Sequence, residues 1–264
     1  MFKRLILFLL LTSSCSTELF NLKSSSFTPS QPISLQNRLK TIKNIHKKQH
    51  YALLLGGGTE ERHRNNISMF YQILLEQGYK RNNIFILESE GGNPPIFPLT
   101  DNMNIQSLDI MMKWLSINIT NEDTLLIYIT GHGLRKDNMS YLILNKAENI
   151  SKDAFRQYLD IINPQIGILI TDQCYWGLYD KDIQLDEWII ITSTTDHQVT
   201  SGSSFIRNLL TSYRLLDIEP FSINDAYLYT LKNDPMILNK KNNPNMSYIK
   251  NDPKNYNVLG EKIH

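Results

Sequence analysis

The segment that decides the fold lies at residues 125–133, which read LLIYITGHG. Its first five residues are apolar without interruption. Continuous apolar runs of this length are typical of parallel strands that helices cover on both faces. Residues 130–133 follow the run directly and are polar or glycine. The stretch therefore predicts a buried parallel strand that ends in a histidine between two glycines.

Further strands and helices alternate on both sides of this segment. Four more apolar runs predict strands at residues 52–55, 84–87, 166–170 and 188–192. Apolar residues at helical spacing predict helices at residues 67–75, 108–115, 155–162, 206–213 and 223–231. Gly78 is expected to end the first helix, and Ser151 to cap the third. This alternation predicts an α/β fold, a three-layer α/β/α sandwich around a mostly parallel central sheet.

The composition limits the classes of partner. The chain has 264 residues, with 41% hydrophobic and 20% charged residues, which is typical of a folded domain. Lys plus Arg is 27 and Asp plus Glu is 26, so the near-neutral charge argues against nucleic acid or an anionic membrane as the main partner. The six histidines are scattered without zinc-ligand spacing, so the sequence predicts no metal site and no cofactor.

The N-terminus has the pattern of an export signal. Two basic residues, Lys3 and Arg4, precede seven apolar residues at 5–11 and then small residues. The apolar run is too short to span a bilayer, so residues 1–15 are interpreted as a signal peptide. Cys15 follows the small residues and resembles the lipid-modified cysteine of a bacterial lipoprotein signal, with simple cleavage nearby as the alternative. We therefore expect an exported protein, secreted or in the cell envelope, that contacts the membrane only through such a lipid.

The remaining chain divides by composition into three parts. Residues 16–47 are polar, with Ser-, Pro- and Lys-rich stretches, and are expected to be a linker. Residues 48–233 carry the strand and helix pattern and are expected to be the folded domain. Residues 234–264 are polar and rich in Asn and Pro, and are expected to be a loosely attached tail.

Reactive side chains follow two successive strands. Ligand sites of open parallel sheets lie beyond the carboxyl ends of the strands, where His132 and Cys174 are expected. A histidine beside a cysteine can raise the thiolate fraction and protonate a leaving amine. The backbone N–H groups of Gly133 and Cys174 could bind the negatively charged oxygen that forms during such a reaction. The pattern therefore predicts thiol nucleophilic catalysis.

These segments resemble a known group of enzymes. Residues 126–133 and 168–174 look like the histidine and cysteine motifs of the caspase-like (clan CD) cysteine peptidases. Within that group they are most similar to the legumain family, which includes the catalytic subunit of the GPI transamidase. Residues 51–55 and 62–63 match the opening strand and helix of the family, so the resemblance covers roughly residues 51–210.

The resemblance implies roles for several residues. His132 and Cys174 would be the catalytic pair, with Gly133 in the oxyanion site. Arg62 and Asp172 would bind the substrate residue that precedes the scissile bond, which makes a peptide or protein the expected partner.

Other positions bear on the substrate pocket and the third catalytic member. Ser193 and Thr194 would belong to the opposite wall of the pocket. Glu60 stands about where legumain has an asparagine that orients the histidine. Tyr175 and Trp176 are larger than their counterparts and are expected to narrow the pocket rim.

Three alternatives to a cysteine endopeptidase remain open. An amine in place of water at the acyl-enzyme would make the protein a transpeptidase. A catalytically inactive relative would bind peptides only. Gly56, Gly57 and Gly58 after the first strand, with Glu88 at the end of the second, fit a nucleotide-binding domain, although Glu61 stands where that motif needs its third glycine.

Overall fold

The computed structural model describes residues 48–90, 97–177, 185–195, 197–200, 204–215, 222–248 and 251–257. The expected signal peptide, Cys15 and the expected linker lie outside the described residues. The positions named below all belong to the described part unless stated otherwise.

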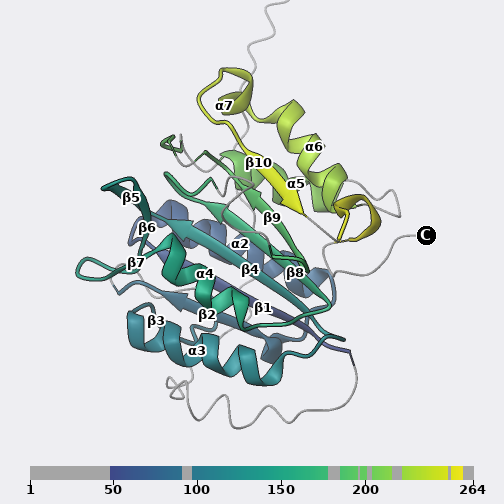
Figure 1. The fold of residues 1–264 in the computed structure, drawn as a ribbon. Helices are drawn as coiled ribbons and strands as arrows, with labels where there is room; N and C mark the ends of the chain where they lie inside the picture. Colours follow the sequence, from purple (N-terminus) through teal and green to yellow (C-terminus); the bar gives the residue numbers. More distant parts are fainter. Residues whose placement is uncertain are drawn as a thin grey trace, which may run out of the picture. The chain divides into compact units, whose positions relative to one another are not determined.

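A seven-stranded sheet forms the centre of the domain (Figure 1). Its order is β10-β9-β8-β4-β1-β2-β3, and every neighbouring pair is parallel except β10 with β9. The strands are β1 (His50–Gly57), β2 (Ile84–Glu88), β3 (Asp101–Asn102), β4 (Thr124–Gly131), β8 (Ile166–Asp172), β9 (Trp188–Thr192) and β10 (Asn245–Tyr248). All five strands predicted from apolar runs are confirmed. β4, which carries the histidine segment, lies between β1 and β8.

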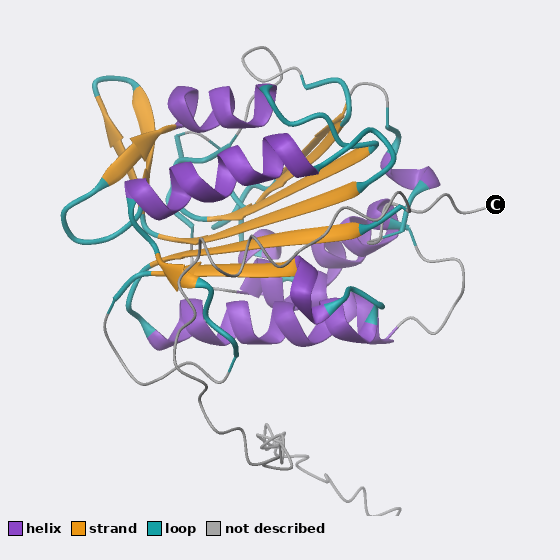
Figure 2. Ribbon diagram, turned by 90° about the horizontal axis from the view of Figure 1, so that it is seen from below, coloured by secondary structure: helices purple, strands orange, loops and turns teal. Residues whose placement is uncertain are grey.

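Helices cover both faces of this sheet, as Figure 2 shows. α2 (Glu61–Glu76), α5 (Ser204–Leu215) and α6 (Ile223–Asn233) pack on one face, and α3 (Ile105–Asn118) and α4 (Lys152–Asp160) on the other. Alternate residues of the central strands point into the two cores, which explains why the strand sequences are apolar throughout. The three-layer α/β/α prediction is confirmed. None of the helices in the described ranges is long and apolar enough to cross a membrane.

The helix boundaries follow the expected local signals. Gly78 has a φ of +92°, and its N–H and that of Tyr79 close the end of α2 on the carbonyls of Leu75 and Leu74. The Ser151 hydroxyl accepts a hydrogen bond from Ala154 N at 3.2 Å and caps α4.

A small antiparallel sheet was not predicted from the sequence. It contains β5 (Gly133–Lys136), β6 (Met139–Ile143) and β7 (Asn149–Ser151), in that order. β5 begins two residues after β4 ends, so the small sheet adjoins the carboxyl end of β4. Its strands are short and partly exposed, and they lack the long apolar runs that marked the central strands.

The C-terminal segment is part of the folded unit beyond the boundary expected at residue 233. After α7 (Pro235–Leu238), β10 pairs with residues 189–192 of β9, and a 3-10 turn, η2 (Pro253–Asn255), follows. Asn251 Nδ2 donates to Glu187 O at 3.0 Å, and Asp234 Oδ1 accepts from Ser204 Oγ at 2.8 Å. A four-residue edge strand in which polar and apolar residues alternate gives too weak a sequence pattern to be recognised before its partner strand is known.

Candidate active site

The ends of β4 and β8 bring His132 and Cys174 to the same place. Thr130 and Asp172 are partners in the β4/β8 register, two residues before the histidine and the cysteine. Gly133 has backbone contact with the cysteine, because a Cβ atom added to this glycine would lie only 1.8 Å from Cys174 O. A side chain at position 133 would therefore collide with the nucleophile segment. Only a glycine lets the two segments approach this closely.

Contacts from the segment after β9 hold the cysteine segment. The Thr194 hydroxyl, which is buried, donates to Gln173 O at 2.9 Å. Tyr175 N donates to Gln198 O at 2.8 Å. Cys174 is half-buried and is a free thiol. These contacts fix the backbone on either side of the thiol.

Tyr175 bends the chain after the thiol, and Trp176 takes a different position from the one expected. Tyr175 has a φ of +60°, the left-handed region that non-glycine residues rarely adopt, and this bends the chain directly after Cys174. Trp176 is buried in the core, where its ring packs edge-on against Phe155 at 5.5 Å between centroids. The expectation that Trp176 narrows the pocket rim is therefore wrong, because its large apolar ring anchors the segment in the core instead.

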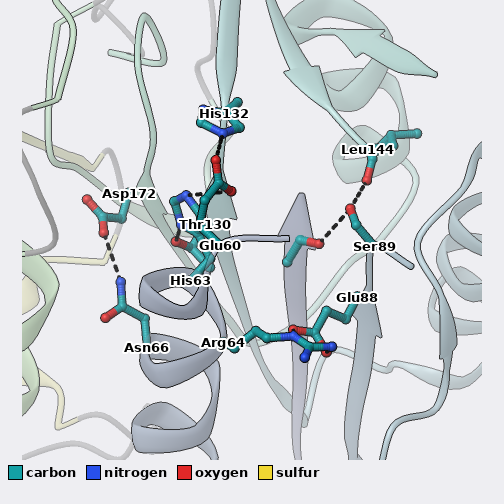
Figure 3. A network of polar contacts seen from close by, with 11 residues as sticks. Glu60, His63, Arg64, Asn66, Glu88, Ser89, Thr130, His132, Leu144 and Asp172 are labelled. Atoms are coloured by element: carbon teal, nitrogen blue, oxygen red, sulfur yellow. Dashed lines mark hydrogen bonds and ion pairs between the residues drawn. The ribbon is translucent and has the colours of Figure 1, made fainter. Parts of the chain in front are cut away.

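A carboxylate orients the catalytic histidine candidate. Glu60, the residue before α2, contacts His132 Nε2 through Oε1 (Figure 3). Burial raises the pKa of Glu60, but the hydrogen bond and charge of His132 more than offset this and lower its pKa overall. Through this contact the Glu60 carboxylate holds the orientation of the His132 ring. The other ring nitrogen, Nδ1, does not contact Glu60 and can accept a proton from another group.

A second histidine lies beside the first. His63, in the first turn of α2, is buried, and its ring centroid is 5.6 Å from that of His132. His63 Nδ1 and the Thr130 hydroxyl are 2.8 Å apart. Burial lowers the pKa of His63 to about 4, and the charge of Arg62 adds to this effect, so His63 is neutral near pH 7.

Asp172 is a buried acid two residues before Cys174. Its Oδ2 accepts from Asn66 Nδ2 at 3.4 Å (Figure 3). Burial raises the pKa of Asp172 to about 7, and the nearby Ser193 hydroxyl and Arg62 guanidinium only partly oppose this rise. Arg62 is half-buried in the first turn of α2. The two residues that the resemblance places in the substrate pocket therefore influence each other electrostatically.

Gly133 presents a usable backbone donor. His132 and Ile143 form a hydrogen-bonded pair between β5 and β6, since Ile143 N donates to His132 O at 3.2 Å. The next pair, Gly133 with Leu142, is then a non-hydrogen-bonded one, in which the N–H points away from the partner strand. This geometry leaves the Gly133 N–H available for a substrate oxygen, as the oxyanion prediction requires.

A cleft of about 760 Å³ opens beside His132. Its lining includes Glu60, His132, Glu90, Met103 and Glu148. Cys174 and Asp172 do not line it. The thiol is therefore not part of this cleft.

The geometry disfavours a nucleotide at the glycine run. A Cβ on Gly57 would lie 2.0 Å from Ile143 O, so protein backbone already occupies the space beside the glycine. Glu88 is buried and paired with Arg64, Oε1 to Nε at 2.8 Å, and is not available to a ribose. Glu60 and Glu61 at the start of α2 would repel a phosphate.

The sequence-predicted residues thus form one region with two parts. His132, Gly133 and Cys174 meet at the strand ends, and Arg62 and Asp172 lie close to each other. Ser193 is buried beside Asp172. Thr194 is buried with its hydroxyl on Gln173 O, so Thr194 supports the backbone directly before Cys174.

The sequence interpretation missed that His63 belongs to this region. Glu60 and His63 have the Glu-x-x-His spacing, which places both residues on one side of a helix start. That spacing was the signal available in the sequence.

No protein-family model matches the chain, and no curated protein shows significant similarity to it. Functional interpretation therefore depends on the geometry of the site.

Proposed function

We propose that this protein is a caspase-like cysteine endopeptidase, with Cys174 as nucleophile and His132 as its acid and base. The observation that carries the proposal is the backbone contact between Gly133 and Cys174 at the ends of β4 and β8. It joins the histidine and cysteine segments at the edge of the sheet where α/β proteins bind ligands.

The contacts of His132 support a defined direction of proton transfer. Because Nε2 contacts Glu60, the thiol proton passes to Nδ1, and the thiolate adds to the scissile carbonyl carbon. The ring then gives this proton to the departing amine, leaving a thioester on Cys174. Water, deprotonated by the same ring, hydrolyses the thioester and restores the thiol.

Charge stabilisation would come from the backbone. The carbonyl oxygen becomes negative when the thiolate adds, and the Gly133 N–H, which faces away from β6, would be the donor that binds this oxygen. A donor of this kind contributes about 3 kcal/mol to stabilisation of the transition state in well-studied enzymes.

Arg62 favours a polar substrate residue before the scissile bond, because its half-buried guanidinium can donate hydrogen bonds to an acceptor on that residue. Asp172 is only 2% exposed, so it would act on the pocket through its electrostatic interaction with Arg62 and not by direct contact with the substrate.

The test combines a thiol-directed peptidyl probe with a peptide library. Cys174→Ala should abolish both labelling and cleavage. Cys15→Ser, the matched variant at the other cysteine of the chain, should leave both unchanged. If the wild-type protein is neither labelled nor active across the library, the peptidase proposal fails and a peptide-binding module becomes the better interpretation.

The same assay separates hydrolysis from transpeptidation. Added amine nucleophiles would appear in the products if an amine competes with water at the thioester. A mass-spectrometric product analysis with and without the amine distinguishes the two reactions.

We also propose that the protein is exported, on the basis of residues 1–15, and that Cys15 carries a lipid. Metabolic labelling with a radioactive fatty acid should mark the wild-type protein and not the Cys15→Ser variant. Absence of label from a membrane-associated wild-type protein would favour simple cleavage of the signal.

A further inference from the structure

Three side chains of the metal-ligand type converge beside His132. The ligand atoms of Glu60, His63 and His132 all lie within 4.8 Å of one another. Glu60 and His63 come from the start of α2, and His132 comes from the end of β4, so two separate elements contribute to the cluster (Figure 3). The third side chain therefore arrives through the fold, which the sequence spacing could not show.

His63 has an atom that the protein leaves unsatisfied. Its side chain is only 3% exposed, and Nε2 has no hydrogen-bond partner in the part of the chain that the structure describes. Glu60 Oε2 lies 3.9 Å from it, beyond hydrogen-bonding distance. Buried polar atoms without partners are rare in folded proteins. A cation held between Nε2 and the other two side chains would satisfy it.

The opposite edge of the His63 ring is already fixed. Nδ1 lies 2.8 Å from the Thr130 hydroxyl, and with Nδ1 as the donor the lone pair of Nε2 points into the cluster. Histidines that bind metals are held in this way by a hydrogen bond at the second nitrogen. The ring is therefore preorganised as a ligand.

The other two side chains have room to adjust. Glu60 and His132 are 43% and 47% exposed and line the 760 Å³ cleft. Small rotations of these exposed groups would bring all three ligands to the bond lengths of about 2.0–2.2 Å that zinc requires. Two imidazoles, one carboxylate and a fourth position open to the cleft match the tetrahedral preference of Zn²⁺.

We propose that Glu60, His63 and His132 form a Zn²⁺ site, and that zinc bound there reversibly blocks the thiol chemistry. The blocking half rests on the proposed peptidase function, whereas the binding half does not. Zinc would take the lone pair of His132 Nε2, in place of the contact with Glu60. The proton of the neutral ring would then stay on Nδ1, which leaves no lone pair to accept the proton of the Cys174 thiol.

Zinc binding is tested first in the full chain carrying Cys174→Ala, so that the thiol cannot contribute. Isothermal titration with Zn²⁺ should give one site per chain. In the same background Glu60→Gln keeps the size of the side chain and removes its charge, and His63→Ala removes a ligand nitrogen. Each should weaken binding at least tenfold.

Two further measurements distinguish the proposed site from nonspecific binding and from binding at the thiol. Glu61→Gln changes the neighbouring acid, which is exposed and outside the cluster, and should bind as tightly as the Cys174→Ala parent. Co²⁺ should give a tetrahedral absorption spectrum in the wild-type protein without a thiolate charge-transfer band. If the His63→Ala protein fails to fold, the exposed Glu60→Gln variant still tests the site.

Inhibition is tested in the wild-type protein with a cleavable peptide. Zinc should inhibit with a constant that matches the dissociation constant of the Cys174→Ala protein, and a chelator should restore activity. Glu60→Gln should shift the inhibition constant at least tenfold, in parallel with binding.

The outcomes separate the two proposals. Zinc binding without any peptidase activity would support the site and refute the blocking role together with the peptidase function. Peptidase activity with no zinc binding by the Cys174→Ala protein would overturn the site and leave the peptidase function standing. Inhibition that is unchanged in Glu60→Gln would place zinc on the thiol and would also overturn the proposal.

Discussion

Replacing Asp172 by Asn should change how the stability of the protein depends on pH. Asp172 is 2% exposed, and burial raises its pKa from 3.8 to about 7. Between these values the folded protein binds a proton that the unfolded chain has lost. The free energy of unfolding therefore falls as the pH rises from about 4 to about 7. Above about pH 7 the loss of stability caused by the buried carboxylate stays constant.

The size of the effect follows from the pKa values. A rise from 3.8 to about 7 corresponds to about 4 kcal/mol of stability lost at pH 8 relative to pH 4. The amide of the Asp172→Asn variant has no proton to lose in this range, so the variant lacks this pH-dependent loss of stability. The free energy of unfolding of the variant minus that of the wild type should therefore rise by about 4 kcal/mol between pH 4 and pH 8.

Urea denaturation at a series of pH values measures this difference. The comparison is insensitive to the packing cost of the new amide, which is the same at every pH. Asp160→Asn is the matched control, because Asp160 is exposed and pairs with Arg156 on the same helix at 3.7 Å. For Asp160→Asn, the free energy of unfolding of the variant minus that of the wild type should vary by less than about 1 kcal/mol over the same pH range. A flat difference for Asp172→Asn as well would show that the buried carboxyl keeps an ordinary pKa, and the reasoning would be refuted.

Three further substitutions test the contacts around the thiol and the helix ends. Gly133→Ala puts a Cβ 1.8 Å from Cys174 O, where about 3.3 Å is normal, and the resulting shift of more than 1 Å should lower kcat/KM about 100-fold. Gly78→Ala, which strains a φ of +92° at the end of α2, should lower the stability of the protein but leave kcat/KM unchanged. Equal activities of the two alanine variants would count against the active-site geometry. Thr194→Val removes the donor to Gln173 O and should cost about 1–3 kcal/mol in urea denaturation, and a loss below about 0.5 kcal/mol would mean that water replaces the hydroxyl. Ser151→Ala removes the α4 cap and should lower the free energy of unfolding by about 1 kcal/mol without changing peptide cleavage, and an unchanged unfolding midpoint would contradict the role of the cap.

The metal-ligand cluster illustrates what sequence spacing alone cannot convey. Glu60 and His63 lie three residues apart, but His132 follows about 70 residues later in the chain. Zinc-ligand spacing concerns residues that are close together in the chain. Such spacing does not show that β1 and β4 lie side by side in the sheet. Because they do, the start of α2, which follows β1, lies next to the end of β4.

The small sheet and β10 were missed for a related reason. Their strands are short and partly exposed, so most of their stabilisation comes from pairing with a partner. The polar residues in these segments fit an edge or a surface as well as they fit a loop. Only the tertiary structure shows which surface is available.

The sequence by itself determined the five central strands, the helices between them and the positions of His132 and Cys174 at strand ends. These features follow from patterns that extend over a few residues, because burial on both faces requires continuous apolar runs and helices require apolar residues at helical spacing. The tertiary structure alone decided which strand ends meet, which polar groups are paired and which are left without partners. Such properties depend on strand order and on close backbone approach, as at Gly133 and Cys174, and these are set by contacts between residues far apart in the chain.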